Sequence, residues 1–107
     1  MKLWKKSETL VEKASREIPA FGLSVGKLRR QYELAGKSES TVVNYSRCLA
    51  QMALHFGCCP SELDKEQVLD YLQYLKNLHK TPSESYFKQT VYGLRALYKL
   101  YGLEDKH

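Results

Sequence analysis

The chain has 107 residues, of which 43% are hydrophobic and 27% are charged. This length and mixture are those of one ordinary globular domain, and they exclude a disordered chain or one that needs metals or disulfides to fold. The net charge of +5 favours an acidic partner such as nucleic acid or a membrane surface, although solubility alone accounts for a charge of this size.

The first 21 residues have the loosest apolar spacing in the chain. Pro19 is expected to stop any helix that forms before it. Two interpretations remain open for this segment: a flexible lead, or a short helix that docks on the core.

Two amphipathic helices are predicted next, over residues 24–35 and 38–56. Gly36 ends the first, Ser38 caps the second, and Gly57 ends the second. The residues predicted to be buried recur three or four positions apart: Val25, Leu28, Tyr32 and Ala35 in the first helix, and Val42, Tyr45, Leu49, Met52 and Phe56 in the second.

A turn over residues 58–63 leads into a third helix, which runs from Asp64 to about His79. Asp64 and Gln67 have the spacing of a capping box. The predicted buried side consists of Val68, Leu72 and Leu75, widened by Leu69 and Leu78.

The fourth helix has the clearest start signal. Thr81 is the expected cap, Pro82 takes the first helical position, Glu84 completes a capping box, and Gly102 ends the helix. Its apolar side is Phe87, Thr90, Val91, Leu94, Leu97, Tyr98 and Tyr101. Four further tyrosines lie off or beside the apolar stripes and are candidates for surface contacts: Tyr71, Tyr74, Tyr86 and Tyr92. The sequence therefore predicts an all-α fold, a compact bundle of four to five helices.

The residue types that carry catalysis are scattered. The three cysteines form no Cys-x-x-Cys pair, the three histidines have no partners at ligand spacing, and no phosphate-cradling glycine-rich loop is present. Cys48, Cys58 and Cys59 are expected to be reduced and to pack as small hydrophobic residues. We therefore expect no catalytic residue, metal or cofactor in this chain. We also expect a soluble cytoplasmic protein, since neither a signal peptide nor a membrane span is apparent.

The second and fourth predicted helices have polar outer faces that are rich in basic residues, whereas acidic residues outnumber basic ones around the third. Small polar residues let a helix approach the DNA backbone closely, and Asn, Gln and Arg reach base edges. These faces supply the candidate DNA-binding residues: Lys37, Ser40, Thr41, Asn44, Arg47, Lys80, Ser83, Ser85, Lys88, Gln89, Tyr92, Arg95 and Lys99. Within this set, Asn44 and Gln89 are the candidates for base contacts, and the lysines and arginines are the candidates for phosphate contacts.

A polar outer face is also the default of any amphipathic helix. The alternative interpretation is a helical protein-interaction module without DNA binding, in which exposed tyrosines meet a partner protein.

Three segments in order carry a resemblance to a known family. The run K-S-E-S-T-V-V-N-Y over residues 37–45 resembles the start of the core-binding domain of tyrosine-type site-specific recombinases, the phage integrase family. The run L-D-K-E-Q-V-L-D-Y-L over residues 63–72 is similar to the family's third helix. The segment from Thr81 to Tyr101, with its L-R-x-L-Y pattern, is similar to the fourth.

This resemblance implies a SAM-like, N-terminal core-binding domain over residues 22–103, preceded by a lead over 1–21 and followed by a tail over 104–107. It implies duplex DNA, a recombination half-site, as the partner, with neighbouring recombinase subunits as further partners. It also implies a C-terminal catalytic domain in the parent protein. The family's catalytic residues have no counterpart in this sequence, so the chain itself is expected to be no enzyme.

Overall fold

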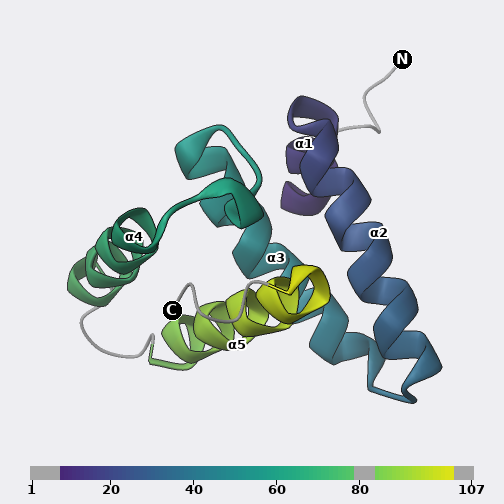
Figure 1. Cartoon of the computed structure of the whole chain (residues 1–107). Coiled ribbons are helices and arrows are strands. Elements are labelled where there is room, and N and C mark those ends of the chain that lie inside the picture. Colours follow the sequence, from purple (N-terminus) through teal and green to yellow (C-terminus); the bar gives the residue numbers. More distant parts are fainter. Residues whose placement is uncertain (1–7, 79–83, 103–107) are drawn as a thin grey trace.

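The computed structural model describes residues 8–78 and 84–102 (Figure 1). These residues form five α-helices and one short 3-10 helix, and the described part contains no strand. The elements in chain order are α1 (Leu10–Glu17), α2 (Pro19–Leu34), α3 (Glu39–Phe56), η2 (Pro60–Glu62), α4 (Lys65–Leu78) and α5 (Glu84–Tyr101). The predicted all-α bundle of four to five helices is confirmed.

The N-terminal part of the chain holds more structure than its loose apolar spacing indicated. Helix α1 begins with a capping box, in which the Thr9 hydroxyl accepts a hydrogen bond from the Glu12 amide at 3.1 Å and the Glu12 carboxylate accepts one from the Thr9 amide at 3.0 Å. It packs against α2 and α3, as the docking-helix interpretation expects.

Helix α1 ends before Pro19, as predicted, and Pro19 also begins the next helix. This proline occupies the first turn of α2. No intrahelical hydrogen bond needs an amide proton at this position, and the fixed φ of proline suits the helix. Helix α2 thus begins five residues before the predicted start at Ser24, and Phe21 becomes fully buried. At the other end of the helix, Ala35 is an exposed cap residue and does not extend the core stripe.

Helix α3 is the central element of the fold, and it packs against α1, α2, η2 and α5 (Figure 1). It begins at the predicted cap, since the Ser38 hydroxyl accepts a hydrogen bond from the Ser40 amide at 3.2 Å. It ends at Gly57, whose φ of +75° lies in the left-handed region that glycine adopts without strain. Its buried residues are Val42, Ser46, Cys48, Leu49, Ala50, Met52 and Ala53.

Helix α4 begins with the predicted capping box. The Asp64 amide donates to Gln67 Oε1 at 3.0 Å, and the Gln67 amide donates to Asp64 Oδ1 at 2.8 Å. Its buried stripe is rotated from the predicted one: Tyr71 is only 2% exposed, whereas Leu69 is 51% exposed. The prediction was wrong on both residues because the rings of His55 and Phe56 on α3 cover the Tyr71 side of the helix.

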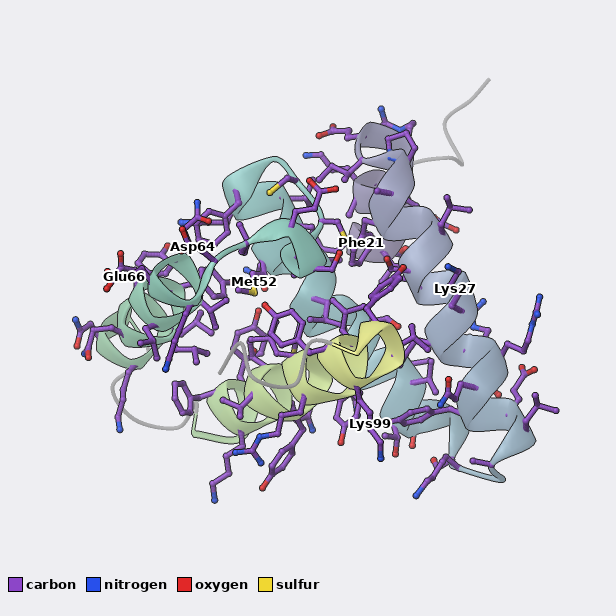
Figure 2. All side chains as sticks on the ribbon, viewed as in Figure 1. Phe21, Lys27, Met52, Asp64, Glu66 and Lys99 are labelled. Atoms are coloured by element: carbon purple, nitrogen blue, oxygen red, sulfur yellow. The ribbon has the colours of Figure 1, made fainter. Side chains whose placement is uncertain are left out.

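Helix α5 lies across α3 and closes the core (Figure 1). Thr90, Leu94, Leu97 and Tyr98 are buried as predicted, and the Tyr98 hydroxyl donates to the Pro60 carbonyl of η2 at 3.1 Å. Tyr101 is 37% exposed, and its hydroxyl lies 2.8 Å from that of Ser24. The expected cap at Thr81 and Pro82, and the expected end of α4 near His79, lie outside the described residues. Figure 2 shows Phe21 and Met52 within the helical interior.

Candidate nucleic-acid interface

A close crossing of α3 and α5 sets the geometry of the candidate site. A Cβ atom added at Gly93 would lie 3.4 Å from Tyr45 Cβ and 3.5 Å from Leu49 Cγ, so the absent side chain lets α5 lie directly on α3. Asn44 directly precedes Tyr45 and Tyr92 directly precedes Gly93. The candidate residues on the two helices therefore flank one crossing point.

The outer face of α5 carries a stripe of cationic and aromatic side chains. Lys88, Tyr92, Arg95 and Lys99 recur at intervals of four, three and four residues, and all four are exposed. We call these four residues the α5 stripe. Figure 2 shows Lys99 on the outer side of the helix. After Glu84 the helix contains no acidic residue.

The cations of this surface have little competition from nearby acids. In residues 8–78 and 84–102, Arg47, Arg95 and Lys99 form no ion pair, whereas Arg16 of α1 pairs with Glu8 and Glu17. The exposed acids Glu66 and Asp70 lie on α4, and Figure 2 shows Glu66 far from Lys99. The α5 stripe thus presents positive charge to solvent, as an anionic partner requires.

The candidate residues at the start of α3 and along it differ in their exposure to solvent. Lys37, Ser40 and Arg47 are exposed, whereas Thr41 and Asn44 are partly buried beside the α5 crossing. The Ser40 hydroxyl is hydrogen-bonded to that of Ser38 at 2.9 Å, so part of its hydrogen-bonding capacity serves the cap.

Arg47 lies apart from the α5 stripe. It lines a cleft that α3 forms with α1 and α2 on the other side, together with Arg29. Gln89 is partly buried on α5, near the crossing. Lys80 and Ser83, together with the side chain of Ser85, lie outside the described part of the chain.

Sequence reasoning did not assign a site role to the basic residues of α2. Lys27, Arg29 and Arg30 are all exposed, and the Lys27 ammonium lies 5.2 Å from the centre of the Tyr101 ring at the end of α5. Their K-x-R-R run was visible in the sequence. Its position beside α3 and α5 was not, because it depends on tertiary packing.

The cysteines and histidine of the described part show no sign of catalysis. Cys48 and Cys59 are buried, and burial raises the pKa of the Cys48 and Cys58 thiols, which keeps them protonated and poorly nucleophilic at neutral pH. His55 packs against the rings of Phe56, Tyr71 and Tyr74. No group of three or more metal-ligating side chains comes together within residues 8–78 and 84–102.

None of the helices in the described ranges is long and apolar enough to cross a membrane.

Comparison with known proteins agrees with this geometry. The family described as "Phage integrase, N-terminal SAM-like domain" matches residues 25–105, a range that begins within α2 and includes α3, α4 and α5. Searches among curated proteins and among solved structures gave no match. The family match covers well over half of the chain and supports an integrase or recombinase role. With its all-α SAM-like fold, this chain belongs to the family of phage integrase N-terminal SAM-like domains.

Proposed function

We propose that this domain binds duplex DNA as the core-binding part of a tyrosine recombinase, with α5 and the N-terminal half of α3 directed at one face of a recombination half-site. The observation that carries the proposal is the α5 stripe, an exposed row of three cations and a tyrosine on a helix without an acidic residue after its first position. In the proposed complex a separate catalytic domain of the parent protein performs the chemistry, and residues 22–103 form the DNA-binding unit.

The proposed DNA contact of each residue follows from the chemistry of its side chain. Lys88, Arg95 and Lys99 contact phosphates, because cations spaced along one helix face can follow the backbone that borders a groove. Asn44 and Gln89 reach base edges from the two helices that cross at Gly93, since a side-chain amide can pair with adenine through two hydrogen bonds. Lys37 adds charge at the start of α3, beside amides that favour an anion.

The testing experiment is a titration of a labelled duplex of about 30 base pairs, followed by fluorescence anisotropy at several salt concentrations. The wild-type chain should bind with an affinity that falls steeply as salt increases. Arg95→Ala combined with Lys99→Ala should lower the salt slope by about two units and the affinity at 0.1 M salt by roughly 60-fold, because each phosphate contact contributes about 0.9 to the slope.

A matched control removes the same charge from another surface. Lys13 on α1 and Lys65 on α4 are both exposed and lie off the proposed interface. Lys13→Ala combined with Lys65→Ala should retain nearly all of the salt slope. Equal losses in the two double variants would show that net charge alone attracts DNA, and no binding even at low salt would refute the proposal. Salt-insensitive self-association without DNA binding would favour the protein-interaction alternative.

A further inference from the structure

A second surface of the domain lies where α1, α2 and α3 meet. These helices enclose an open cleft of about 580 Å³, lined by the start of α1, by Gly22, Val25, Gly26 and Arg29 of α2, and by Val43, Ser46 and Arg47 of α3. Gly26 helps to keep the cleft open, because a Cβ atom added there would have nothing within 4 Å. This glycine has an ordinary helical φ, so neither a turn nor a close helix approach explains it.

The cleft combines an apolar lining with two arginines. Leu10 and Val43 on its walls are 38% and 42% exposed. Arg29 and Arg47 form no ion pair with a carboxylate of residues 8–78 or 84–102. Glu12 also lines the cleft, but its carboxylate accepts the hydrogen bond from the Thr9 amide that completes the α1 cap. The cleft therefore suits an apolar side chain that is flanked by carboxylates.

A surface of that description exists on the same molecule. Glu66, Leu69 and Asp70 are neighbours on the outer face of α4, at the three- and four-residue spacing of one helix side, and all three are exposed. Leu69 is 51% exposed between these two acids. Neither acid forms an ion pair within the described residues.

The two surfaces of one copy face away from each other. Helix α4 lies on one side of α3, and α1 and α2 lie on the opposite side (Figure 1). A contact between the α4 face and the cleft must therefore join two copies. Such a contact is heterologous, since each copy uses a different surface, and it leaves one cleft and one α4 face available for further copies.

We propose that the outer face of α4 in one copy docks into the α1–α2–α3 cleft of a second copy. Leu69 enters the space in front of Gly26, and Glu66 and Asp70 pair with Arg29 and Arg47. The contact goes beyond the proposed DNA binding and does not involve the α5 stripe. Charge complementarity selects a second copy of the chain as the occupant, because the acidic-apolar face and the basic-apolar cleft carry charges of opposite sign.

The test uses sedimentation velocity over a range of protein concentrations. Wild-type protein should show concentration-dependent association. Arg29→Glu alone and Asp70→Arg alone should each remain monomeric, because either change places like charges across the contact. A mixture of the two variants should associate again through heterologous contacts, since the intact cleft of one meets the intact α4 face of the other, and the changed cleft and the changed face also carry opposite charges. Both changes in one chain should restore association.

Two further variants separate this contact from other effects. Arg30→Glu makes the same charge change on α2 at an exposed residue that does not line the cleft, and it should leave association unchanged. Gly26→Leu fills the space without changing charge and should abolish association. The proposal is wrong if wild-type protein stays monomeric throughout or if the mixture does not associate. The duplex titration of the Arg95→Ala, Lys99→Ala variant reports on DNA binding separately, so either proposal can fail without the other.

Discussion

At the scale of single residues, two exposed glycines of the bundle have opposite conformational demands. Gly26 lies in the middle of α2 with a helical φ and open space where a side chain would project. Gly57 ends α3 with a φ of +75°, a region in which an L side chain is strained. The backbone conformation thus requires glycine at position 57. The helix itself does not require glycine at position 26.

Alanine at these two positions should change stability in opposite directions. Gly26→Ala should raise the free energy of unfolding by about 0.5–1 kcal/mol, because it lowers the entropy of the unfolded chain and fits the helix without a clash. Gly57→Ala should lower it by about 1–2 kcal/mol through left-handed backbone strain. Urea denaturation followed by circular dichroism measures both. A stabilising Gly57→Ala variant would contradict the assigned helix end.

At the scale of helices, local capping determined where α3 and α4 begin. Ser38, Asp64 and Gln67 make the hydrogen bonds that their spacing predicted. Asp64→Ala should lower the free energy of unfolding by about 1 kcal/mol, because it leaves the Gln67 amide without its partner at the start of α4. Gln67→Ala keeps the Asp64 side chain and should cost less. If both variants unfold at the wild-type urea concentration, the capping box contributes nothing to stability.

Predictions that depended on tertiary packing were less accurate. The order and the period of the helices follow from the sequence, but periodicity alone cannot say which edge of an apolar stripe a neighbouring helix covers. Tyr71 is buried because His55 and Phe56 of α3 meet it, and Leu69 is left in solvent on the other edge. The early start of α2 was missed for a related reason, since a proline that ends one helix can also begin the next.

The same distinction applies to the candidate site. The α5 stripe lies on one helix, so its spacing in the sequence was enough to predict that its residues share a face. The α1–α2–α3 cleft brings together residues 9–12, 22–29 and 43–47. No local pattern connects these segments, and Arg29 could be placed beside Arg47 only once the packing of α2 on α3 was known.

At the scale of the whole molecule, hydrogen bonds from tyrosine hydroxyls connect the elements of the C-terminal half of the bundle. Tyr98 of α5 donates to the Pro60 carbonyl, and Tyr86 of α5 donates to Gln51 of α3. Tyr86 also helps to raise the pKa of Tyr71 on α4. Burial is the main cause that raises the pKa of Tyr86 and of Tyr98 from 10 to about 12, and it raises that of Tyr71 further. The folded state therefore holds these phenols in their neutral form.

This arrangement predicts a specific loss of stability at alkaline pH. A group whose pKa is raised by folding contributes stability that is fully present below its unfolded pKa and is lost as pH rises toward its folded pKa. The free energy of unfolding should accordingly fall between about pH 10 and pH 12, and the Cys48 and Cys58 thiols should add a smaller fall of the same sign from about pH 9, the ordinary pKa of a thiol. Urea denaturation at a series of pH values measures this slope, and absorbance of the ionised phenol should appear together with unfolding.

Tyr98→Phe separates the ionisation from the packing of the ring. The variant should lose about 1 kcal/mol at neutral pH, because the bond from Tyr98 is gone and the Pro60 carbonyl keeps only the Leu63 amide as a donor. It should also show a shallower fall above pH 10, because one titrating phenol is gone. Tyr74→Phe is the matched control: this tyrosine is 45% exposed, and its replacement should leave both the neutral stability and the alkaline slope nearly unchanged. A slope as steep in Tyr98→Phe as in the wild-type chain would mean that the alkaline transition arises elsewhere, and that the bond between α5 and η2 does not couple protonation to folding.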